Sequence, residues 1–294
     1  MSRTFWRWIA AILGFVALLV AAEFALRLRY RRYVMPCATP ASGRVTLVAL
    51  GDSIVAGWPH GLDLAWPALL AERLQAAYPD VQWRVTNAGV PGETAPKGYA
   101  RFERDVSAAG PQLVLIAFGL NDCYPARYGM DRWLEGDVPN GVRRSFLVRA
   151  GAARADRLGR RLGLLPRPTP ELTPQAAPRT SLQGFADALQ ALVDRAEVLG
   201  IRPVLLTMTP LAQSDVEGVA VRAAIYPAYN EAIRLVAARN SLPVVELAAG
   251  EPSGAILPDG FHLTAAGQEW VARQAFEQLA AAGVWRDVSG SNPP

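Results

Sequence analysis

The sequence predicts an α/β protein whose parallel sheet is covered by helices on both faces. Short apolar runs, typical of buried strands, alternate along the chain with segments that have the spacing of amphipathic helices. Strands that are separated by helices pair in parallel, and both faces of a parallel sheet are buried. The chain has 294 residues, of which 51% are hydrophobic, so it has enough apolar side chains for a large core and too many for a disordered protein.

Five apolar runs are predicted to be the strands of this sheet. In chain order they cover residues 45–50, 81–86, 113–118, 203–208 and 243–247. The functional residues of such sheets gather beyond the carboxyl ends of the strands. We therefore expect the functional residues in the loops that follow these runs.

Four segments have the pattern of the helices that cover the sheet. The first carries Pro67 in its first turn, and the second and fourth end at Gly200 and Gly283, which are typical start and stop signals. In chain order the helices are predicted at residues 66–78, 182–199, 226–239 and 264–282. These elements define a domain over residues 45–285, and we expect residues 286–294 to be a flexible tail.

Residues 124–180 interrupt the alternation and are too many for a plain loop, so we interpret them as an insertion. Within it, residues 142–167 carry eight arginines and a single acid, Asp156, and residues 166–178 are rich in proline. The simpler interpretation is a solvated helical segment. The alternative is a basic cover that contacts anionic lipid head groups or an acidic polymer.

The N-terminal region has the pattern of a membrane anchor. Residues 9–22 are an uncharged apolar run, with Trp6 and Trp8 before it and an arginine cluster at 27–32 after it. The helical pattern continues without a break toward the ~20 residues that a bilayer requires. We expect residues 1–33 to be an uncleaved signal anchor with a transmembrane helix, and residues 34–44 to be a linker. A cleaved signal peptide is the alternative, and a buried helix of the main domain is less favoured.

Two features of the sequence give opposite indications of the side of the membrane on which the main domain lies. Two arginines precede the apolar run and four follow it, which by the positive-inside rule directs the main domain to the cytoplasm. A signal-type segment followed by a large domain is instead typical of an exported protein, and this pattern directs the main domain out of the cytoplasm. We expect a protein anchored in the inner membrane, with its main domain on the periplasmic or extracellular face.

Charge and cysteine content exclude several classes of partner. The net charge is +4, but six of the 30 basic residues and one of the 26 acids lie in residues 1–33, so the rest of the chain is nearly neutral and no nucleic-acid partner is expected. The two cysteines are Cys37 and Cys123. We expect two free thiols, with a disulfide between them as the alternative outside the cytoplasm. Clustered zinc ligands are missing from the sequence, so we expect no metal.

Candidate chemistry begins directly after the first predicted strand. Gly51, Asp52 and Ser53 form a turn that would project the serine hydroxyl at the edge of the sheet. A serine hydroxyl is a weak nucleophile and needs an adjacent base. By itself, a Gly-Asp-Ser sequence is an ordinary turn.

The candidate base is His262, one of only two histidines in the chain. The other, His60, has no acid placed to orient it. Asp259 lies three residues before His262, so the two side chains share a face in a helical turn. A carboxylate that holds one ring nitrogen leaves the other free to accept the serine proton.

Donors for an oxyanion follow the second and third predicted strands. Gly89 and Gly92 let backbone N–H groups approach a ligand closely, and Asn121 offers a side-chain amide. We interpret Asp52 and Asp122, which adjoin these motifs, as ties for the strand-end loops rather than as catalytic groups.

Taken together, these motifs resemble the SGNH hydrolase superfamily, the GDSL-type esterases and lipases. The matching residues, in chain order, are Gly51-Asp52-Ser53, Gly92, Gly119-Leu120-Asn121-Asp122 and Asp259-Gly260-Phe261-His262. The resemblance implies a three-layer α/β/α flavodoxin-like fold with a five-stranded parallel sheet.

The resemblance also implies a role for each site residue. Ser53 would be the nucleophile, His262 the base and Asp259 the group that orients it. The oxyanion donors would be the N–H groups of Ser53 and Gly92 and the amide of Asn121, with Gly89 as the alternative to Gly92.

These roles predict a serine hydrolase that cleaves carboxylic esters through an acyl-enzyme and needs no cofactor. Its substrate would be an ester of a small molecule, a lipid or an acylated glycan. The first alternative is an envelope O-acyltransferase that passes the same acyl group to a glycan. The second is a catalytically silent binding domain at the envelope.

Overall fold

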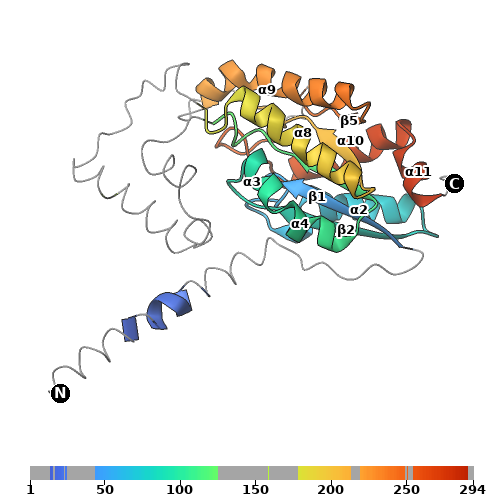
Figure 1. The fold of residues 1–294 in the computed structure, drawn as a ribbon, viewed down its shortest axis with the longest axis horizontal. Coiled ribbons are helices and arrows are strands. Elements are labelled where there is room, and N and C mark those ends of the chain that lie inside the picture. Colours follow the sequence, from blue (N-terminus) through green and yellow to red (C-terminus); the bar gives the residue numbers. More distant parts are fainter. Residues whose placement is uncertain are drawn as a thin grey trace. The chain divides into compact units, whose positions relative to one another are not determined.

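The computed structural model describes most of the predicted α/β domain (Figure 1). It covers residues 14–15, 17–22, 24, 44–124, 158, 178–212, 219–248, 250 and 254–290. The chain divides into two compact units, and every element named below belongs to the unit formed by Tyr33–Pro125 and Leu172–Pro294.

A five-stranded sheet forms the centre of this unit, and all of its strands run parallel, as predicted. In chain order the strands are β1 (Arg44–Gly51), β2 (Gln82–Gly89), β3 (Leu113–Ala117), β4 (Arg202–Leu206) and β5 (Val244–Val245). They lie in the order β2-β1-β3-β4-β5, which is the flavodoxin-like arrangement. The expectation of a five-stranded parallel sheet is confirmed.

Helices cover both faces of the sheet, because its strands are apolar on both sides. On one face α2 (Trp66–Ala77) packs against α10 (Ala265–Ala281). On the other, α8 (Leu182–Val198) packs against α3 (Ala95–Ala100) and α9 (Val219–Arg239). Short elements complete the connections: η1 (Leu62–Leu64), α4 (Phe102–Asp105) and η2 (Ser107–Ala109).

Local sequence signals fix where several helices begin. Pro67 occupies the first turn of α2, where its missing N–H costs nothing. The side chain of Ser181 accepts a hydrogen bond from the Gly184 N–H at the start of α8, and Thr264 caps α10 in the same way. The cap on α10 also fixes the direction from which the preceding loop, with His262, enters the helix.

Three helices, α9, α3 and α4, differ from the prediction. Helix α9 begins at Val219 rather than at residue 226, and Pro227 lies inside it. A proline usually marks a helix start because it removes an interior hydrogen bond, so the pattern placed the boundary too late. The short helices α3 and α4 between β2 and β3 were not predicted.

The expected tail from residue 286 is wrong in its first part. Helix α11 (Val284–Ser289) continues the fold there. The indole of Trp285 is fully buried, donates a hydrogen bond to the Phe276 carbonyl and stacks edge-on against Trp83. This burial anchors a segment that is too short for its periodicity to be recognised.

In the part of the chain that the structure describes, no helix is both long and apolar enough to cross a bilayer. Most of the predicted anchor at residues 1–33, the linker at 34–44 and the insertion at 124–180 lie outside the described residues. These three assignments therefore stay predictions.

Candidate active site

The turn that carries Ser53 leaves the sheet at its centre. Gly51, the last residue of β1, pairs with Gly89 of β2 and with Ala117 of β3. A Cβ atom at position 51 would lie 2.4 Å from the Ala117 carbonyl oxygen, so only glycine fits between the strands. The Asp52 carboxylate accepts a hydrogen bond from the Ile54 N–H at 2.9 Å, which tightens the turn. Ser53 follows and is 8% exposed.

The three residues expected to act together are joined by two hydrogen bonds. The distance from Ser53 Oγ to His262 Nε2 is 3.0 Å, and that from His262 Nδ1 to Asp259 Oδ2 is 2.7 Å. Because a carboxylate only accepts, Nδ1 carries the proton and Nε2 is left as the acceptor for the serine hydroxyl. The backbone N–H groups of Phe261 and His262 donate to the other Asp259 oxygen and hold the carboxylate in place.

The surroundings of this pair keep the imidazole neutral and the carboxylate charged. Burial lowers the pKa of His262 below 6.5, and this effect outweighs the opposing influence of Asp259. Burial on its own would raise the pKa of Asp259, but the hydrogen bonds from His262 and Phe261 bring it below its usual value. At neutral pH the ring is therefore an unprotonated base oriented by an ionised carboxylate.

His60 does not belong to this arrangement. Its Nε2 atom lies 3.1 Å from the carbonyl oxygen of Leu263, so the ring ties its own turn to the chain just after His262. Of the two histidines, only His262 contacts Ser53, as expected from the sequence.

The predicted oxyanion donors lie in the loops that leave β1, β2 and β3. No described residue accepts a hydrogen bond from the N–H groups of Ser53 or Gly92. Gly92 has a φ of +80°, a conformation that favours glycine. By contrast, the Gly89 N–H already donates to the Asn87 side chain at 2.9 Å. Because the Gly89 N–H already has an acceptor, Gly92 is favoured over Gly89 as the second oxyanion donor.

Asn121, the third expected donor, is held by the turn that carries the serine. Its Nδ2 atom donates to the Asp52 carboxylate at 3.1 Å. Asp52 therefore ties the loops after β1 and β3 together, and the interpretation of this residue as a loop tie is confirmed. One amide N–H remains for another acceptor.

Asp122 ties a different pair of loops. Its carboxylate is fully buried and accepts from the Ala95 N–H, with oxygens at 3.1 and 3.2 Å, and from the Thr180 hydroxyl. Burial raises the pKa of Asp122 to about 7 and that of Asp52 to about 6, despite these hydrogen bonds. The expected structural role of Asp122 is confirmed.

Arg101 is a positioning residue that the sequence analysis missed. It is 7% exposed, and its guanidinium group donates to the backbone carbonyls of Gly51 and Ala88, at the ends of β1 and β2. The carboxylates of Glu93 and Asp105 neutralise its charge. The group thus clamps the carboxyl ends of two strands beside Ser53, and no local motif marks it because its partners come from four separate positions.

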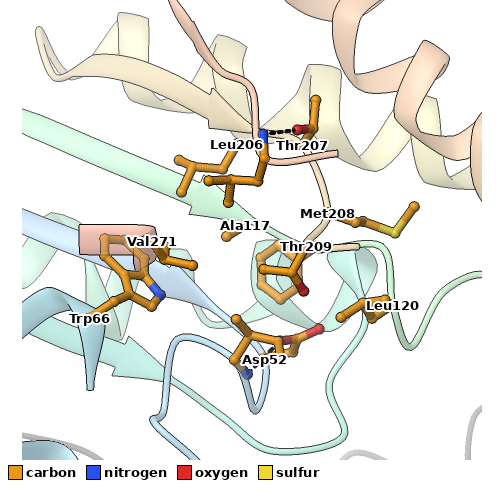
Figure 2. Close-up of a pocket in the computed structure, with 12 residues that line it drawn as sticks. Asp52, Trp66, Ala117, Leu120, Leu206, Thr207, Met208, Thr209 and Val271 are labelled. Atoms are coloured by element: carbon orange, nitrogen blue, oxygen red, sulfur yellow. Dashed lines mark hydrogen bonds between the residues drawn. The ribbon is translucent and has the colours of Figure 1, made fainter. Parts of the chain in front are cut away.

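A mostly apolar pocket lies on the inner side of the serine turn (Figure 2). The Asp52 carboxylate forms one wall, and Trp66 and Val271 lie on another side. The buried Trp66 Nε1 and Thr209 Oγ1 atoms have no partner among the described residues. Ser53, Asp259 and His262 do not line this pocket, so it is distinct from the space in front of the serine hydroxyl.

Neither a metal cluster nor a reactive thiol is found in the described regions. No group of three or more His, Cys, Asp or Glu side chains there is arranged to hold a metal ion. Cys123 is a free, buried thiol whose pKa burial raises to about 12, so it stays protonated at neutral pH. Cys37 lies outside the described residues, and its pairing stays a prediction.

Fold and site together define a class: three-layer α/β/α proteins with a Ser-His-Asp constellation at the carboxyl edge of a parallel sheet. Within this class, the chain belongs to the GDSL-like Lipase/Acylhydrolase family, whose sequence model matches residues 49–270. The family expected from the motifs is confirmed.

Individual relatives match over shorter stretches. The chain is 37% identical over 82 residues to the thioesterase 1/protease 1/lysophospholipase L1 of Escherichia coli K12, which is 28% of this chain and 37% of that protein. It is 37% identical over 102 residues to the acetylxylan esterase of Geobacillus stearothermophilus, which is 32% of this chain and 42% of that protein. The chain therefore spans less than half the length of these two relatives.

Solved structures show the same fold over a longer stretch. The lipase/acylhydrolase from Enterococcus faecalis superposes with a TM-score of 0.56 at 19% identity, and the match covers 81% of this chain and 96% of that one. At this level of identity the likeness shows the fold alone.

The burial of Asp122 predicts a pH dependence of stability. Its folded pKa of about 7 exceeds the ordinary 3.8, so the folded state binds the proton more tightly than the unfolded state does. Its contribution, on the order of a few kcal/mol, is fully present below the unfolded pKa of 3.8 and is lost as the pH rises through the folded value of about 7. Asp122→Asn should flatten the fall in the free energy of unfolding over this range, measured by urea denaturation. An equally steep fall in the variant would contradict the assignment.

Proposed function

We propose that this protein hydrolyses carboxylic esters by a serine-based, acyl-enzyme mechanism. The observation that carries the proposal is the continuous hydrogen-bonded chain from Ser53 Oγ through the His262 ring to Asp259, with distances of 3.0 and 2.7 Å. Membership of the GDSL-like Lipase/Acylhydrolase family supports the same reaction class. One of the relatives is named as a thioesterase, protease and lysophospholipase, and the other as an acetylxylan esterase.

The acylation half-reaction assigns a task to each member of the triad. Ser53 Oγ attacks the ester carbonyl carbon while His262 Nε2 takes the hydroxyl proton. The low pKa of His262 keeps Nε2 free for this proton at neutral pH. Asp259 stabilises the imidazolium that forms. The imidazolium then protonates the leaving alkoxide as the carbon–oxygen bond breaks, which leaves the acyl group on Ser53.

Deacylation uses the same groups a second time. His262 Nε2 removes a proton from a water molecule, whose oxygen attacks the acyl carbon. The second tetrahedral intermediate collapses, and the proton returns from His262 to Ser53 Oγ. The products are a carboxylic acid and an alcohol, and no cofactor enters the balance.

Charge that develops on the carbonyl oxygen needs donors aimed at it in advance. We assign this role to the N–H groups of Ser53 and Gly92 and to the Nδ2 amide of Asn121. The support is that the two backbone N–H groups have no partner among the described residues, whereas Asn121 is oriented through its bond to Asp52.

Removal of the nucleophile or the base tests the proposed function. Ser53→Ala and His262→Ala should each abolish measurable hydrolysis of a short-chain aryl ester, because each removes one end of the proton transfer. Release of 4-nitrophenol from the acetate ester reports the rate, and circular dichroism checks that the fold is intact. Turnover by purified Ser53→Ala protein at the wild-type rate would overturn the mechanism.

The oxyanion assignment predicts a smaller loss. Asn121→Ala should lower kcat on the order of 10²- to 10³-fold while KM changes little, because the amide acts mainly on the charge of the transition state. Steady-state kinetics with the same aryl ester separate the two parameters. A change confined to KM would indicate a role in binding the ester instead.

We further propose that residues 1–33 anchor the domain in the inner membrane, with the site on the periplasmic or extracellular side. The support is the uncharged run at 9–22 with tryptophans before it and arginines after it. Protease added to intact spheroplasts should digest the domain, and a cytoplasmic marker protein should survive. Protection of the domain until the membrane is lysed would place it in the cytoplasm.

A further inference from the structure

Arg222 is a buried cation beside the proposed catalytic groups, and the mechanism does not use it. It lies near the start of α9 and is only 4% exposed. Its guanidinium carbon lies 4.2 Å from the ring centroid of Tyr124 and 4.1 Å from that of Phe261. The cation therefore lies over the faces of two aromatic rings, which attract its charge.

Two of the three guanidinium nitrogens of Arg222 lack a hydrogen-bond acceptor among the described residues. Its Nε and Nη1 atoms are buried and have no partner in the described part of the chain. Arg101, the other buried arginine of this region, shows the usual solution, since its nitrogens donate to two carbonyls and two carboxylates. A buried cation without such partners is costly, so an unsatisfied one needs a functional explanation.

The neighbouring charges do not supply the missing partner. Asp52 attracts Arg222, but the Asp52 carboxylate already accepts from Ile54 and Asn121 and forms no ion pair with Arg222. Burial lowers the pKa of Arg222, and the positive charge of Arg179 lowers it further. Among the described residues, the Nε and Nη1 donors of Arg222 therefore remain without an acceptor.

Arg222 lies between the two loops that carry the proposed catalytic groups. Phe261, on one side, directly precedes His262, and the two rings are 4.3 Å apart. Tyr124, on the other side, follows the loop that contains Asn121. The charge of Arg222 also contributes to the low pKa of His262, so the guanidinium group acts on the reacting centre.

We propose that Arg222 binds an anionic group of the ester substrate, a carboxylate or a phosphate, close to the scissile bond. This inference rests on the proposed ester hydrolysis at Ser53. The planar fork of a guanidinium group matches the oxygens of carboxylate and phosphate, and its contacts with two aromatic rings hold the group in place for this interaction. A substrate anion would provide the acceptors that Nε and Nη1 lack.

Matched pairs of esters test the proposal and locate the anion. One pair carries the charge on the acyl side: 4-nitrophenyl hydrogen adipate against 4-nitrophenyl hexanoate. The other carries it on the alcohol side: 1-acetylglycerol 3-phosphate against 1-acetylglycerol. In one of the pairs, Arg222→Met should lower the ratio of kcat/KM for the charged over the neutral ester roughly 10- to 100-fold, as expected for hydrogen bonds to a charged group.

Two further variants separate recognition from packing. Arg222→Lys keeps the charge but loses the fork, and it should give an intermediate ratio. Arg234→Met removes a half-buried arginine of the same helix that pairs with Glu246, and it should leave the ratio unchanged. Equal losses on charged and neutral esters in both Arg222 variants would mean that Arg222 only positions Phe261 and His262, and would overturn the proposal.

A binding measurement keeps this test independent of hydrolysis. Calorimetric titration of the full-length Ser53→Ala protein with adipate and with glycerol 3-phosphate should detect binding of one anion, and Arg222→Met should abolish it. Binding of neither anion would overturn the Arg222 proposal. Failure of the wild-type protein to cleave any of the four esters would instead overturn the ester-hydrolase function.

Discussion

The parallel register of the three central strands is the constraint on which the site depends. Gly51 of β1 lies opposite Gly89 of β2 and Ala117 of β3, so the three strands end at the same level. The loops that carry Ser53, Gly92 and Asn121 therefore leave the sheet side by side. The close approach at Gly51 leaves no room for a Cβ atom, so a shift of one strand would move the serine turn away from its neighbours.

Buried polar groups hold these loops at fixed distances. Asp52 joins the serine turn to Asn121, Asp122 joins the third loop to the start of α3, and Arg101 clamps the ends of β1 and β2. Each of these groups is costly to bury, and hydrogen bonds to its partners offset most of this cost. Arg222 departs from this pattern, since its Nε and Nη1 atoms have no partner among the described residues, and this contrast with Arg101 is the basis for the proposed anion contact.

Much of the fold and the site was predictable from local sequence. The five apolar runs coincide with the five strands to within a few residues, because buried parallel strands have little tolerance for polar side chains. Ser53 was identifiable because it directly follows the first predicted strand, and His262 and Asp259 because only two histidines exist and one has an acid three positions earlier. The boundaries of α9 and the existence of α3, α4 and α11 were not predictable, since proline and short length obscure the helical period.

By itself, the sequence determined the five strands, the longer helices that cover them, the candidate site motifs and the family, because each of these is recognised from residues that are close together in the chain. Only the tertiary structure decided which glycine N–H is available, which arginines are satisfied and how Ser53 meets His262. These are contacts between residues as far as 209 positions apart. Their geometry follows from strand register and helix packing, which no local pattern of residues records.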